Sequence, residues 1–242
     1  MNDFKCGFAY LLSGFTLILK PKIRFYSLTP LFLNISLFLL LIFYAYGELD
    51  RVISTLESQW QWLEWLNWII WVFFFIAASI LIFFCFSIVG NLISAPFNSL
   101  LAHAVEVELS GRKTDTATEQ SIYKIIINSF KSECHKILYF SLRVPILIFL
   151  FFIPLVNIAA PFVWFVFGAW MIALEYCDYP MSNHNIEFAE QRMKHSKNRL
   201  LVYGFGVGTL IFTIIPIVNF IIIPVAVAGA TKMYAESIKS VQ

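Results

Sequence analysis

The residues best suited to binding a small anion lie near the N-terminus, in the segment Pro21-Lys22-Ile23-Arg24. Proline is common at the first position of a helix, so this segment is expected to begin one. The guanidinium of Arg24 can hold two oxygens of a tetrahedral anion, with the Lys22 ammonium and free N–H groups at the helix start as further donors. The segment is therefore a candidate oxyanion site. The open alternative is that both cations only mark the cytoplasmic side of a membrane helix.

A repeated proline–asparagine motif is a second candidate. Ile153-Pro154-Leu155-Val156-Asn157 corresponds to Ile215-Pro216-Ile217-Val218-Asn219, and a second proline follows each copy, at Pro161 and Pro224. The prolines predict a loop in each apolar block, and non-helical backbone at membrane depth must be buried in protein or line a wet cavity. The asparagine that ends each copy is therefore a candidate residue of a solute path. Alternatively, both motifs only shape and cap a tight turn.

Few other polar side chains interrupt the apolar blocks. Arg143 could offer a fixed positive charge to an anion, or its side chain could extend to lipid headgroups. Asn34 and Asn91 could line a path, or they could hydrogen-bond between helices. The sequence has no G-x-S-x-G, H-E-x-x-H or Walker A motif, and its cysteines and histidines lack metal-ligand spacing. We therefore expect neither an enzyme nor a metal or cofactor site.

The composition places these residues in a membrane protein. Hydrophobic residues make up 60% of the 242-residue chain and charged residues 13%, whereas soluble domains carry roughly 25% charged residues. The net charge of +2 is too small to indicate nucleic-acid binding. Because the apolar surface is too large for one core, the sequence predicts an all-α integral membrane protein with the lipid bilayer as a partner.

Two stretches are long enough to cross a bilayer, since a span needs about 20 apolar residues. The first covers residues 25–46, and the second covers residues 68–110 with a cytoplasmic extension at its end. Lysines and arginines precede the first span, while the loop 47–67 is mostly acidic. The positive-inside rule therefore places the N-terminus in the cytoplasm and the loop outside.

Residues 116–136 are expected to form an amphipathic helix, which a capping-box pattern at Thr116 and Glu119 begins. Its apolar face is expected to lie on the membrane surface or on the body of the protein, with the lysines towards the other face. The apolar residues are Ile122, Ile126, Phe130, Cys134 and Leu138, and the lysines are Lys124, Lys131 and Lys136.

Two apolar blocks follow, residues 137–176 and 200–235, joined by a polar connector over residues 177–199. The limbs on either side of the first loop would be only about 22–25 Å long at 1.5 Å per residue, shorter than the hydrocarbon core of about 30 Å. We therefore predict two helical hairpins that enter from the cytoplasm and turn inside the membrane, which also leaves the C-terminus in the cytoplasm. Two short full spans per block are the alternative.

Several segments, in order and without large gaps from about residue 7 to 235, together resemble the CysZ family of bacterial sulfate transporters. Each segment alone is unspecific, but the ordered set is specific. The segments are Gly14-Phe15, Pro21-x-x-Arg24, Pro30-Leu31-x-x-Asn34, Asn91-Leu-Ile-Ser-Ala-Pro-Phe-Asn98 leading to Glu106, Tyr179-Pro180-Met181-x-Asn183-His184, and Ile215-Pro216 through Pro224 to Ala226-Val-Ala-Gly-Ala-Thr231.

The resemblance implies proton-dependent sulfate uptake across the bacterial inner membrane for cysteine biosynthesis. It also implies a homo-oligomer with two long transmembrane helices and two partly penetrating hairpins, and it adds Glu106 to the path candidates. Family members often carry an arginine pair where this chain has Arg24 and Phe25, although Lys22 could compensate. The main alternative is a non-transporting membrane scaffold related to eukaryotic proteins that share the domain. A membrane enzyme acting on lipid fits less well.

Overall fold

The computed structural model describes residues 3–29, 94–111 and 122–238, together with isolated positions between residues 32 and 76. Most of the expected outer loop and of both expected long spans lies outside these residues, as do the candidates Asn34 and Asn91. So does the expected capping pattern at Thr116. The features described below belong to one compact unit, made of Met1–Leu31 and Ala95–Gln242.

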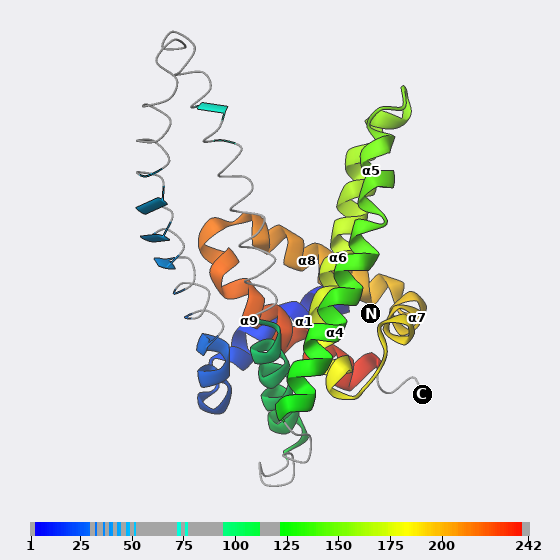
Figure 1. Cartoon of the computed structure of the whole chain (residues 1–242). Helices are drawn as coiled ribbons and strands as arrows, with labels where there is room; N and C mark the ends of the chain where they lie inside the picture. The colour runs from blue at the N-terminus through cyan, green and yellow to red at the C-terminus, as the bar shows by residue number, and fades with distance from the viewer. Residues whose placement is uncertain are drawn as a thin grey trace. The chain divides into compact units, whose positions relative to one another are not determined.

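Within the described part, every regular element is a helix, which confirms the all-α fold there (Figure 1). Two described segments, Ala160–Asn183 and Ile221–Ile238, are long and apolar enough to cross a membrane. Residues 21–29 and 94–110 are also helical. The labelled elements are α1 (Asp3–Ile18), α4 (Ile122–Ser141), α5 (Val144–Leu150), η3 (Val156–Ile158), α6 (Ala160–Asn183), α7 (Phe188–Lys197), α8 (Arg199–Ile214), α9 (Pro216–Met233) and η4 (Tyr234–Ile238).

Helix α1, to which the sequence analysis assigned no element, packs against α8 and α9 at the centre of the unit (Figure 1). Its buried residues recur at helical spacing, so one face of the helix is covered: Gly7, Leu11, Gly14 and Leu17. A Cβ added at Gly7 would overlap the backbone oxygen of Leu201 in α8, and one at Gly14 would overlap that of Val225 in α9. The absence of a side chain therefore lets the three helix backbones approach closely.

Replacing Gly7 with alanine is expected to destabilise the protein by about 1–3 kcal/mol, the usual range for overpacking. The control is Gly168→Ala on α6, where no described atom lies within 4 Å of an added Cβ. That change should leave stability equal or higher, because alanine favours a helix over glycine by about 1 kcal/mol. Thermal unfolding of both variants in detergent measures the difference. Equal melting temperatures for the two variants would show that α1 does not pack this closely.

The first proline–asparagine motif forms a turn, as predicted. Helix α5 ends at Leu150, residues 151–155 turn, and Asn157 lies in the short η3. The chain then returns as α6, with Pro161 in the first helical turn, where its missing N–H needs no partner. Helix α6 continues past residue 176 to Asn183, so the expected polar connector begins as helix.

The second motif does not form the expected loop. The break between α8 and α9 is the single extended residue Ile215, and Pro216 already begins α9. A residue before proline is disfavoured in the helical conformation, whereas proline itself suits the first helical position. Pro224 lies inside α9, and Asn219 belongs to this helix rather than to a loop. The two copies of the motif therefore fold differently.

Helix α4 contacts the body of the protein through polar side chains, and its described apolar residues point away from that body, so of the two expected positions for the apolar face only the membrane surface stays open. Its polar residues Ser132, Glu133 and Lys136 are buried, while Phe130 and Leu138 are exposed, Leu138 by 59%. The polar face can be buried because α6 offers it charged and hydroxyl partners. An exposed apolar face on an amphipathic helix fits a position on the membrane surface.

Candidate functional site

The candidate oxyanion segment begins a helix as predicted, but two of its backbone N–H groups already donate hydrogen bonds within the protein. The backbone N–H groups of Ile23 and Arg24 donate to the Lys20 carbonyl oxygen at 3.0 and 2.9 Å. The expectation that free N–H groups at this helix start face an anion is therefore wrong at these two positions. The Arg24 side chain is exposed, so the site rests on its guanidinium.

Glu108, on the helix over residues 94–110, pairs with the lysines of this segment. Its Oε1 lies 3.1 Å from Nζ of Lys20, and its Oε2 lies 3.7 Å from Nζ of Lys22. The hydrogen bond from Lys20 lowers the pKa of the Glu108 carboxyl. Glu108 thus offsets the charge of Lys22, whereas no described carboxylate pairs with Arg24. The structure favours Arg24 over Lys22 as the anion-binding residue.

The other described candidates lie in separate contacts. Oε1 of Glu106 is 3.0 Å from Nε2 of His184, so this carboxylate has a partner at the end of α6. The Arg143 guanidinium lies 3.4 Å from the centre of the Tyr139 ring and donates to the Tyr139 carbonyl oxygen. The contacts among described residues join neither of them to Arg24.

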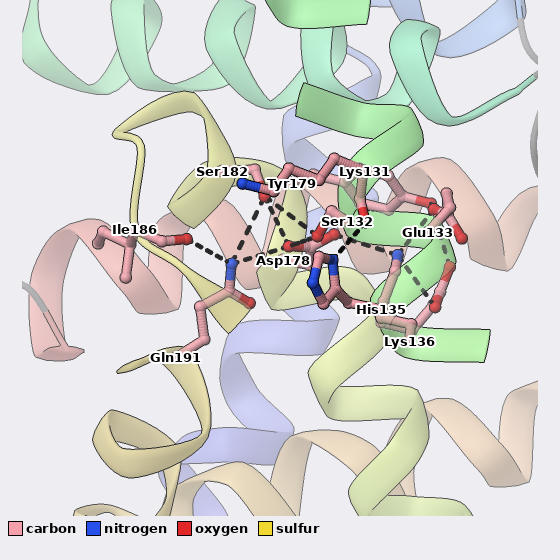
Figure 2. A network of polar contacts seen from close by, with 11 residues as sticks. Lys131, Ser132, Glu133, His135, Lys136, Asp178, Tyr179, Ser182, Ile186 and Gln191 are labelled. Atoms are coloured by element: carbon pink, nitrogen blue, oxygen red, sulfur yellow. Dashed lines mark hydrogen bonds and ion pairs between the residues drawn. The ribbon is translucent and has the colours of Figure 1, made fainter. Parts of the chain in front are cut away.

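A buried ion cluster, which the sequence analysis missed, centres on Lys136 (Figure 2). The Lys136 ammonium of α4 lies 2.7 Å from the Glu133 carboxylate and 3.1 Å from the carboxylates of Glu175 and Asp178 on α6. Burial by itself would lower the pKa of Lys136, but Glu175 and Asp178 raise it well above its ordinary value. Lys136 therefore stays charged and holds α4 to α6.

Asp178 connects this cluster to α7. Its Oδ1 accepts hydrogen bonds from the hydroxyls of Ser132 and Ser182 and from Nε2 of Gln191, at 2.5, 2.6 and 2.8 Å (Figure 2). The three donors come from α4, α6 and α7. The Asp178 carboxylate is thus satisfied on one oxygen by neutral donors and on the other by Lys136, as a buried charge requires.

The cluster carries more acid than base, since three carboxylates surround one ammonium. Burial, with the Glu175 carboxylate adding to the effect, raises the pKa of Glu133 to about 7. Glu133 precedes the apolar block that begins at residue 137, so it lies outside the expected membrane segments. A carboxyl with this pKa is able to take up a proton near neutral pH.

The raised pKa of Glu133 predicts a pH dependence of stability. The folded state binds more protons than the unfolded state between the ordinary carboxyl value of 4.5 and about 7. Its contribution to stability should therefore fall as pH rises through this window. Denaturant unfolding of the wild type and Glu133→Gln, compared from pH 4.5 to 8, isolates this contribution. A stability difference between the two proteins that does not change with pH would contradict the assignment.

The fold and the site thus define a class, an all-α membrane protein with an exposed arginine at a helix start as its candidate anion site. Residues 10–224 match the family model described as Sulfate transporter CysZ/Etoposide-induced protein 2.4. The "Sulfate transporter CysZ" of Vibrio parahaemolyticus serotype O3:K6 (strain RIMD 2210633) is 38% identical over 245 residues, which covers 98% of this chain and 97% of that protein. The chain therefore belongs to the Sulfate transporter CysZ/Etoposide-induced protein 2.4 family, which confirms the resemblance.

Proposed function

We propose that this protein transports sulfate across a bacterial membrane. The observation that carries the proposal is its 38% identity, over nearly the whole of both chains, to a sulfate transporter. The exposed Arg24, with no carboxylate partner in the described part of the chain, supplies a group that suits sulfate. A transporter needs such a group to be accessible, because sulfate must exchange its water for hydrogen-bond donors on entry.

The same proposal includes the location, assembly, membrane orientation and proton dependence of the transporter. The protein lies in the inner membrane as a homo-oligomer with both termini in the cytoplasm, and it supplies sulfate for cysteine biosynthesis. The asymmetry of lysines and arginines supports this orientation. The two hairpins are proposed to enter the membrane without crossing it, although α6, from Ala160 to Asn183, is longer than the expected limb and is by length and composition able to cross. Transport depends on protons, for which Glu133 is the best-suited described group, because its pKa is about 7.

The proposed orientation predicts which side of the membrane a reagent must reach. A cysteine introduced at Ser58, in the acidic loop, should react with an impermeant maleimide added from outside. A cysteine introduced at Ser196, on the exposed side of α7, should react only after the membrane is opened. The opposite labelling pattern would reverse the orientation without affecting the proposed substrate.

Uptake of labelled sulfate into liposomes that contain only this protein tests the function. Wild-type protein should take up sulfate above empty liposomes, and Arg24→Ala should take up markedly less, while Arg199→Ala on α8 should match the wild type. If sulfate uptake is absent for both orientations of the protein in the liposome and for every pH gradient, the alternative of a non-transporting membrane scaffold is favoured. Uptake that does not respond to a pH gradient would remove only the proton dependence.

A further inference from the structure

A cavity of about 370 Å³ lies where α4, the end of α6 and the start of α7 meet. Its volume is near the lower end of the usual range for small-molecule sites, about 300–1,000 Å³. The lining is mixed, with cationic, hydroxyl, amide and apolar side chains. It consists of Lys131, Ser132, His135, Ser182, Asn185, Ile186, Glu187, Phe188, Ala189 and Arg192.

The cations of this cavity form part of a longer stripe. Lys131, His135 and Tyr139 follow each other at every fourth position of α4, so they lie along one side of this helix, and Arg143 follows in the turn between α4 and α5. The Tyr139 ring carries two guanidinium groups, Arg143 at 3.4 Å and Arg192 of α7 at 4.9 Å from its centre. Arg192 belongs to α7, and its stacking on Tyr139 holds it beside the stripe on α4.

Among the described residues, no ion pair offsets the positive charge of this stripe. The ion pairs of the described residues include none with Lys131, Arg143 or Arg192, and Glu187 is the one acidic residue that lines the cavity. The nearby Asp178 carboxylate is buried beneath the cavity and is paired with Lys136. The cavity therefore offers Lys131 and Arg192 to an anion while its acidic neighbour is already neutralised.

Two further observations concern the hydrogen-bond donors around the cavity. Nε of Arg192 is buried and has no hydrogen-bond partner among the described residues, and its guanidinium lies over the Tyr139 and Phe188 rings. Helix α7 begins without a side-chain cap, and its first residues, Phe188 and Ala189, line the cavity. Uncapped N–H groups at a helix start and the guanidinium of Arg192, a residue that lines the same cavity, are donors that a tetrahedral anion accepts well.

We propose that this cavity binds an oxyanion of the phosphate or sulfate type, held by Lys131, Arg192 and the start of α7. The anion could be a free one, or it could be the phosphate of an anionic phospholipid. Ile127, Phe130 and Leu138 expose an apolar surface on α4 on which acyl chains would lie. The site is separate from Arg24, and it does not depend on whether the protein transports sulfate.

The test uses the full-length protein, purified in neutral detergent and stripped of lipid. Calorimetric titration with sulfate and with inorganic phosphate is carried out on Arg24→Ala protein, in which binding at the first candidate site is weakened, so that the second site dominates the signal. Adding Arg192→Gln or Lys131→Gln should weaken binding about tenfold or more, the usual effect of losing a hydrogen bond to a charged group. Lys197→Gln, the same charge change at an exposed position of α7, should leave it unchanged.

Whether the bound anion is a phospholipid headgroup is tested in nanodiscs of phosphatidylcholine with and without phosphatidylglycerol. If the site holds a headgroup, native mass spectrometry should show retained phosphatidylglycerol on the wild type and the Lys197→Gln protein, and loss of it in the two cavity variants. Lys131 is exposed, so its replacement keeps the test valid even if Arg192→Gln fails to fold. Unchanged binding of sulfate, phosphate and phosphatidylglycerol in folded Lys131→Gln protein would overturn the proposal.

Discussion

Replacing Lys136 with methionine is expected to destabilise the protein by about 3–5 kcal/mol, the usual effect of removing one partner of a buried ion pair. The Lys136 side chain is 3% exposed and contacts three carboxylates, so its loss leaves buried negative charges without a counterion. Unfolding of the purified protein in detergent at pH 8 measures the effect. Acidification should restore part of the lost stability, because protonation removes the uncompensated charges.

The control for Lys136 is Lys197→Met, which makes the same replacement at an exposed position of α7. It should change stability by no more than about 0.5 kcal/mol, as surface substitutions usually do. Lys136→Met combined with Glu133→Gln and Asp178→Asn should recover much of the loss, since buried charges removed together leave less charge unpaired. A Lys136→Met protein as stable as the wild type at pH 8 would mean that Lys136 is not buried among these carboxylates.

Replacing Arg24 with alanine is expected to weaken sulfate binding by about 1.5–3 kcal/mol, which corresponds to roughly ten- to a hundredfold. Sulfate is a strongly hydrated dianion, and the two parallel donors of a guanidinium replace part of its lost water. Arg24→Lys should have an intermediate effect, because it keeps the charge but loses the fork of donors. Calorimetric titration of the purified proteins with sulfate provides the measurement. If sulfate binds at two sites, the binding phase that the cavity variants leave unchanged is assigned to Arg24.

Two controls accompany the Arg24 variants. Arg199→Ala removes an exposed arginine from the start of α8 and should leave sulfate affinity unchanged. Lys22→Ala should have a smaller effect than Arg24→Ala, because Glu108 already offsets the charge of Lys22. Equal affinities in wild-type, Arg24→Ala and Arg24→Lys protein would show that Arg24 only sets topology, and would direct the search to Arg143 and the proline–asparagine motifs.

The sequence by itself determined the class of this protein, its family and the helix at Pro21. These features depend on local properties, namely the apolar content of the chain, the ordered motifs and the effect of proline on its neighbours. The turn at Pro154 was predictable for the same reason. The assignment of a loop to Pro216 failed because proline can either interrupt a helix or begin one, and the sequence alone does not distinguish the two.

Only the tertiary structure decided which face of α4 is buried and which charges are paired. Lys136 looked like a solvent-facing lysine on an amphipathic helix, yet its partners Glu175 and Asp178 lie on α6. Glu108 likewise reaches the candidate anion segment from a helix distant in sequence. Hydrophobic periodicity shows that a helix has two different faces. Whether its polar face turns inwards depends on the partners that distant residues provide, because a buried charge is tolerated only where it is paired.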